Sequence, residues 1–126
     1  PMPLRRLYAH FTYVPLDVER MRRAAAFLVG EHDFKSFCSA DAQVESTVRQ
    51  VDLAEVRQEG AEIVIRIAGR GFLYNMVRII AGTLMDVGRG RKEPEDIQKI
   101  LEQKDRQAAG PTAPACGLTL IGYEFL

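Results

Sequence analysis

Arg78 is the residue of this sequence whose position most needs a chemical explanation. It lies inside the long apolar stretch 72–87, at the border between a helical stripe of apolar residues and a more polar side that holds Thr83 and Asp86. A cation withdrawn from water without a partner is very costly, so Arg78 needs an anion. Asp86 is the local candidate, but it lies eight positions along the helix, beyond the usual i,i+3 and i,i+4 reach. The better candidate is therefore a carboxylate from elsewhere, in this chain or in another segment.

Basic residues are concentrated around this arginine, although the chain as a whole is balanced at 17 Lys+Arg and 17 Asp+Glu. Arginine, which binds phosphate bidentately, dominates the basic set. Five cations could form a stripe that contacts phosphates: Arg66, Arg70, Arg89, Arg91 and Lys92. The alternative is that the Gly-Arg-Gly triplets at 69–71 and 88–90 are turn glycines with solvated arginines, because neither fits a phosphate-loop motif. On both readings we expect the loop after Gly88 to bear no core.

The other side chains that could bind a metal or take part in catalysis indicate neither a metal nor a cofactor. His10 and His32 have no partner at metal-ligand spacing. Cys38 and Cys116 form no CxxC pair and are too few for a disulfide framework, so we expect reduced thiols in the cytosol. Ser36, Ser39 and Cys38 lack an arranged base, so the sequence gives little support for a nucleophilic role.

Length and composition describe the frame that must position these residues. A chain of 126 residues, with 47% apolar and 27% charged residues, is typical of one folded domain over 1–126. No apolar run reaches the roughly 20 residues that a membrane span needs, and the start lacks a signal-peptide pattern. We therefore expect a cytoplasmic protein without a membrane segment.

Hydrophobic periodicity predicts an α+β fold, with an antiparallel sheet and helices packed against it. Alternation of Ile63, Ile65 and Ile67 indicates one buried strand face and an opposite face open to solvent. The expected elements are an extended segment 4–14, a helix from the Asp17 cap to Gly30, a tight turn 31–37, an exposed loop 38–47, hairpin strands 48–57 and 62–68, helices over 72–87 and from 94–96 onward, and a last strand 118–125.

Several segments, in the same order, resemble the C-terminal half of TruA-type tRNA pseudouridine synthases. They are 16–25 (LDVERMRRAA), 30–37 (GEHDFKSF), 71–78 (GFLYNMVR) with 82–88 (GTLMDVG), 104–106 (KDR), and 111–115 (PTAPA) with 117–120 (GLTL). The resemblance implies that the domain is one half of a pseudouridine synthase fold. It also implies a homodimer whose partner is the anticodon arm of tRNA.

The resemblance further implies a reaction without cofactor or metal. A uridine at tRNA positions 38–40 is flipped into a pocket, an aspartate attacks, the glycosidic bond breaks, and the uracil is rejoined through C5. Arg78 would pair with that aspartate, keeping it ionised and oriented. Leu118 would lie beneath the uracil, Tyr74 would line the site, and Phe72 would support the pocket wall.

These 126 residues do not contain the Gly-Arg-Thr-Asp-Ala-Gly motif that carries the family's aspartate in the N-terminal half. The chain opens inside an apparent strand, so we expect it to be a fragment that is inactive alone. The competing interpretations are a non-catalytic RNA-binding or dimerisation module, and a purely structural ferredoxin-like domain. The structural interpretation would leave Arg78 in need of some other partner.

Overall fold

An antiparallel sheet is the frame of this computed structural model, which describes residues 3–12, 16–39, 46–60, 62–73, 75–113 and 118–125. Within these residues the strands are β1 (Pro3–Thr12), β2 (Gly30–Asp33), β3 (Val48–Glu59), β4 (Glu62–Arg70) and β5 (Leu118–Phe125), in the order β2-β3-β4-β1-β5. All neighbouring strands pair antiparallel, and β1 and β5 are described by their backbones. The α+β class and the antiparallel sheet predicted from the sequence are confirmed.

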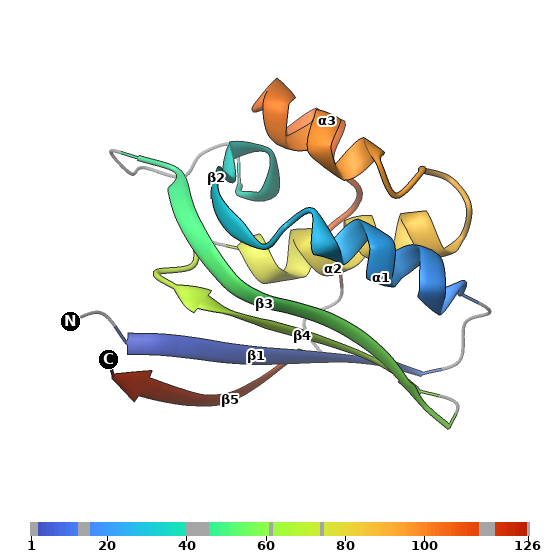
Figure 1. Ribbon diagram of the computed structural model, residues 1–126, viewed down its shortest axis with the longest axis horizontal. Helices are drawn as coiled ribbons and strands as arrows, with labels where there is room; N and C mark the ends of the chain where they lie inside the picture. Colours follow the sequence, from blue (N-terminus) through green and yellow to red (C-terminus); the bar gives the residue numbers. More distant parts are fainter. Residues whose placement is uncertain are drawn as a thin grey trace.

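Helices α1 (Val18–Ala26), α2 (Met76–Gly88) and α3 (Asp96–Gln103) lie on one side of this sheet, as Figure 1 shows. The start of α1 is as predicted, because the Asp17 side chain accepts a hydrogen bond from the Arg20 amide. Met21, Ala24 and Ala25 face the core at helical spacing. None of the helices in the described ranges is long and apolar enough to cross a membrane.

The β3–β4 hairpin is also as predicted, with Gly60 in the left-handed conformation at its turn (φ +64°). Ile63, Ile65 and Ile67 are buried, which confirms the inner face. The outer face is less open than the alternation predicts, because Val64 and Ala68 are only 2% and 4% exposed. Strand β4 lies between β3 and β1, so both of its edges are flanked by other strands.

The prediction of a tight turn over 31–37 is wrong for its first half. Gly30–Asp33 forms the edge strand β2, which pairs with the start of β3 from Gly30 opposite Val51 to Asp33 opposite Val48. The strand is held by a partner from a distant part of the chain, and its own residues do not alternate in burial. The second half of the predicted segment does form a turn, the single helical turn η1 (Lys35–Phe37).

The long helix begins four residues later than predicted, at Met76 and not at 72. Asn75 has a left-handed backbone (φ +61°), which a continuing helix cannot include. Phe72 therefore precedes the helix. Within α2, every residue except Arg78 is buried.

A buried serine joins η1 to the end of α3. Ser36 Oγ donates to the Ile100 carbonyl (2.7 Å) and accepts from the Asp105 amide (2.8 Å). This contact places η1 beside the second single turn, η2 (Arg106–Ala108). Two segments about 70 residues apart thus become neighbours near the start of α2.

We predict that Ser36→Ala lowers the free energy of unfolding by about 1–3 kcal/mol, because a buried carbonyl and a part-buried amide both lose their partner. Urea unfolding followed by circular dichroism measures the change. Ser46→Ala removes a hydroxyl bonded to the Val48 amide at an exposed position and is the control, with an expected change within about 0.5 kcal/mol. Equal losses in the two variants would contradict this account of Ser36.

Candidate functional site

Arg78 is held by two neutral acceptors. Its Nε donates to the Ala113 carbonyl (2.8 Å), and its Nη1 donates to Asn75 Oδ1 (3.3 Å). No carboxylate of the described residues lies within 4.0 Å of the guanidinium, and Asp86 pairs with other cations. The guanidinium is thus half-buried and oriented, while its positive charge has no counter-charge in the described part of the chain.

The carbonyl that Arg78 uses belongs to segment 110–113, here called the strap. The Ala113 amide donates to the Arg78 carbonyl (2.9 Å), so the two residues are joined twice. At the other end of the strap, the Gly110 amide donates to Thr83 Oγ1 (2.9 Å). Gly82 lets the strap approach, because a Cβ there would lie 1.7 Å from the Pro111 carbonyl oxygen. Glycine is thus required in the middle of a buried helix, where alanine is ordinarily preferred.

Asn75 is a site residue that the sequence reasoning missed. Its Oδ1 accepts from Arg78, and its Nδ2 donates to Ser39 Oγ (3.3 Å). Asparagine tolerates the left-handed conformation better than most residues, which fits it to the position before α2. The available signal was an asparagine three residues before the arginine, at a spacing that meets on a helical face.

The arrangement leaves part of the guanidinium available for chemistry. Arginine has five N–H groups, and Nη2 makes no hydrogen bond with the described residues. A carboxylate that arrived at this side would meet an oriented, planar donor whose charge is not already compensated. Such a pairing lowers the pKa of a carboxyl group and holds it in one orientation.

The residues predicted to line the pocket are only partly described. Phe72 is half-buried, and a Cβ on Gly69 would lie 2.9 Å from its ring. Leu118 is the first residue of β5, where its backbone pairs with Ala9 of β1. Tyr74 lies outside the described residues.

The basic residues predicted to form one stripe are divided between two places. Arg66 and Arg70 lie on β4, whereas Arg89, Arg91 and Lys92 follow the far end of α2, about 20 Å along a helix of 13 residues. Arg66 pairs with Glu55 at 3.8 Å. The structure does not bring the five residues together.

The sequence predicts that the loop after Gly88 bears no core, but the structure shows that its cations surround a buried carboxylate. The Asp86 side chain is only 8% exposed, and Arg89, Arg91 and Lys92 place nitrogens 3.5, 3.7 and 3.6 Å from its oxygens. A buried carboxylate needs such compensation. These cations therefore stabilise the end of α2.

Cys38 is a protonated thiol in this environment. Burial raises the pKa of the Cys38 thiol, and the Asp33 carboxylate adds to the increase. The thiol donates to the Lys35 carbonyl (3.3 Å) and is not part of a disulfide. Cys116 lies outside the described residues. Among the residues that the structure describes, no three His, Cys, Asp or Glu side chains are grouped so that they could hold a metal ion.

Comparisons with known proteins converge on one family. Residues 24–125 match a family model described as tRNA pseudouridine synthase. Proteins named tRNA pseudouridine synthase A are similar to the chain: that of Halalkalibacterium halodurans is 52% identical over 90% of the chain and 43% of its own length. The relative from Pelobacter propionicus is 48% identical over 98% of the chain and 50% of its length, and that from Brevibacillus brevis 53% over 92% and 48%. The chain spans about half the length of these curated relatives.

We predict that Gly82→Ala detaches the strap. In an ordinary helix interior this change stabilises by about 1 kcal/mol, but here the new Cβ meets the Pro111 carbonyl, so we expect a loss of about 1–3 kcal/mol. Hydrogen exchange of the Ala113 amide should become faster, because its bond to the Arg78 carbonyl breaks.

Gly90→Ala is the matched control, since nothing lies within 4 Å of its Cβ position although its φ is +84°. It should reduce stability by about 1 kcal/mol through the backbone alone and leave the Ala113 amide protected. A stabilised Gly82→Ala variant with unchanged Ala113 exchange would show that the strap does not depend on this glycine.

Proposed function

The chain belongs to the tRNA pseudouridine synthase family, and from this premise we propose that residues 1–126 are the C-terminal domain of an enzyme that isomerises uridine to pseudouridine in the anticodon arm of tRNA. The observation that carries the proposal is Arg78. Its guanidinium is fixed by the neutral oxygens of Ala113 and Asn75 and keeps its charge available.

In this proposal the missing partner of Arg78 is an aspartate supplied by an N-terminal half of the enzyme. A guanidinium beside it keeps that carboxyl group ionised at neutral pH, since the charged form gains the interaction. Because the Nε edge is already bonded to Ala113, the carboxylate is directed to the remaining N–H groups. Arg78 thus orients the nucleophile and does not itself attack.

The reaction needs no external oxidant or reductant, because uridine and pseudouridine are isomers. The aspartate attacks, the glycosidic C–N bond breaks, and the uracil rotates and is rejoined through C5. C5 then loses its proton, N1 carries a proton in the product, and the aspartate is released. Leu118 is proposed to support the uracil from beneath, with Tyr74 and Phe72 at the pocket wall. Leu118 begins β5, five positions after Ala113 of the strap in the sequence.

The proposed partners are the anticodon arm of tRNA and a second copy of the full-length enzyme. Arg66, Arg70, Arg89, Arg91 and Lys92 remain proposed phosphate contacts. For the last three, the contact with RNA would be added to their pairing with Asp86. Phosphate contacts fix the position of an RNA and do not by themselves read its sequence.

We predict that the 126-residue chain alone forms no pseudouridine, because the nucleophile that Arg78 orients comes from the N-terminal half. Release of tritium from an anticodon stem-loop labelled at uridine C5 measures turnover, since the C5 hydrogen is lost in the reaction. The full-length enzyme is the positive control. Turnover by the purified chain that persists after removal of any trace of full-length enzyme would contradict the proposal and favour a self-sufficient catalyst.

We predict that Arg78→Lys in the full-length enzyme lowers the single-turnover rate at least about a hundredfold, since lysine lacks the planar pair of donors. Arg78→Ala should have at least the same effect, and Leu118→Ala a milder one because it removes contact area without charge. Arg23→Lys, at an exposed pair with Glu95, is the control and should retain the wild-type rate. A near-normal rate in a folded Arg78→Lys variant would exclude this role for the arginine.

A further inference from the structure

The cations of the described residues fall into two sets according to their partners. Most have a carboxylate within 4.0 Å: Arg20, Arg22, Arg23, Arg57, Arg66, Arg89, Arg91, Lys92 and Lys99. The others whose side chains the structure describes have no such carboxylate among the described residues: Lys35, Arg49, Arg70, Arg78, Lys104 and Arg106. The second set is here called the uncompensated cations.

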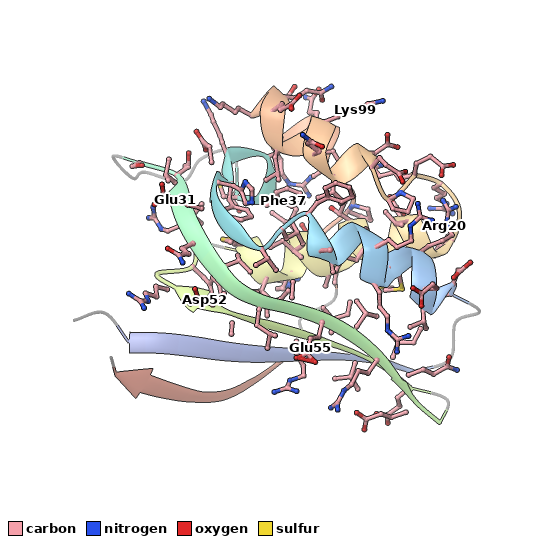
Figure 2. All side chains as sticks on the ribbon, viewed as in Figure 1. Arg20, Glu31, Phe37, Asp52, Glu55 and Lys99 are labelled. Atoms are coloured by element: carbon pink, nitrogen blue, oxygen red, sulfur yellow. The ribbon has the colours of Figure 1, made fainter. Side chains whose placement is uncertain are left out.

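The uncompensated cations gather at one end of the molecule, around the start of α2. Arg70 ends β4 opposite Gln50 of β3, and Arg49 Nε donates to the Gly71 carbonyl (2.6 Å). Lys35 belongs to η1 and Arg106 to η2, which are in contact. Figure 2 shows Arg20, a paired cation, at the opposite end from Glu31 of β2. Positive charge is thus balanced at one end and left uncompensated at the other.

A groove of about 550 Å³ opens between η1 and η2 at this end. Its lining includes the Asp105 carboxylate and Thr47, whose hydroxyl donates to Asp33. It also includes the ammonium groups of Lys35 and Lys104, the guanidinium of Arg106 and the hydroxyl of Ser39. These are the donor types that bind phosphate. Ser36 of η1 forms hydrogen bonds with Ile100 at the end of α3 and with Asp105 just before η2, and these bonds hold the two walls together.

Asp105 lines the groove, and Asp33 accepts from Thr47 of its lining; both carboxylates accept hydrogen bonds from neutral donors. Asp33 Oδ1 accepts from the Lys35 amide (3.0 Å) and from Thr47 Oγ1 (2.5 Å). Asp105 Oδ1 accepts from the Gln107 amide (3.0 Å). Neither forms an ion pair with Lys35 or Lys104, and those two ammonium groups make no hydrogen bond with the described residues. The ammonium groups of Lys35 and Lys104 are therefore available to bind an anion in the groove.

The backbone of Lys104 supports a role for its side chain. Lys104 ends α3 in the left-handed conformation (φ +52°), which glycine or asparagine adopts at lower cost. A lysine in this position accepts a backbone penalty and places an ammonium group at the wall of the groove.

The groove is connected to Arg78 on two sides. Ser39, in its lining, accepts a hydrogen bond from Asn75, which holds the guanidinium of Arg78. Arg106, also in its lining, donates to the Gly110 carbonyl (2.9 Å) and to Thr112 Oγ1 (3.2 Å) of the strap. An anion in the groove would thus lie beside the residues that orient Arg78.

We propose that the groove between η1 and η2 binds a backbone phosphodiester of the RNA substrate, with Lys35 and Lys104 as its charged contacts. This inference rests on the proposed function, in which Arg78 acts on a nucleotide of tRNA. A phosphate next to that nucleotide is the anion that an RNA brings closest to the reacting base. The contact would be independent of sequence and would fix the RNA beside Arg78.

The test is the salt dependence of RNA binding by the full-length enzyme. Binding of a fluorescent anticodon stem-loop is titrated at several salt concentrations for the wild type, Lys35→Gln, Lys104→Gln and the double variant. Because both lysines contact one phosphate, complete loss of that contact should reduce the slope of log affinity against log salt by roughly 0.7–0.9. The double variant should show the largest reduction, and replacement of both lysines by arginine should preserve the wild-type slope.

Lys99→Gln is the matched control, because Lys99 is a 74% exposed lysine of α3 paired with Asp96. Its slope should equal that of the wild type. If the double variant is folded and has the slope of Lys99→Gln, the groove does not bind phosphate and the proposal is overturned.

Arg78→Lys separates this proposal from the proposed function. We expect that variant to lose turnover. Its slope of log affinity against log salt should still fall when Lys35 and Lys104 are also replaced by glutamine. An active Arg78→Lys enzyme whose slope still depends on Lys35 and Lys104 would overturn the catalytic role and support the groove. An inactive Arg78→Lys enzyme whose slope is insensitive to both lysines would do the reverse.

Discussion

A guanidinium can lie at the edge of an apolar helix only where oxygen atoms accept its hydrogens, and at Arg78 those oxygens are neutral. The paired contacts of Arg78 with Ala113 join α2 to the strap through a side chain and through the backbone. Other features follow from this junction. Gly82 is required for the strap to approach, Thr83 holds its beginning, and Asn75 accepts the second donor of the guanidinium. The result is an arginine that is oriented without being neutralised.

The two ends of α2 differ in whether the charged side chains there are paired with opposite charges. At its C-terminal end, Asp86 is buried and surrounded by Arg89, Arg91 and Lys92, so anion and cations stabilise each other within the domain. At its N-terminal end, Arg78 and its basic neighbours have no carboxylate within 4.0 Å among the described residues, and a groove opens beside them. The first arrangement contributes to folding. In our proposal, the second binds partners that bring negative charge, namely a carboxylate from another segment and an RNA backbone.

Local sequence patterns predicted the elements whose formation depends on local physics. Asp17 and the apolar spacing after it define α1, and the alternation of Ile63, Ile65 and Ile67 defines the inner face of β4. Residues 30–33 carry no such alternation, and they form a strand only because β3 offers an edge. The position of Arg78 at the border of the core was also predictable, but its acceptor was not. The Ala113 carbonyl lies 35 residues away, and every residue has a carbonyl, so no residue type marks it.

The central claim is that Arg78 is held in place before any carboxylate arrives, and NMR relaxation of its Nε–H group in the 126-residue chain tests it most directly. If Ala113 and Asn75 hold the guanidinium, the order parameter of this group should approach that of rigid backbone, about 0.85. Arg57 is the internal reference, because its side chain is 50% exposed and lies on the β3–β4 hairpin, where we expect a value below about 0.6. An Arg78 value as low as that of Arg57 would contradict the account, because the arginine would then be oriented only by its missing partner.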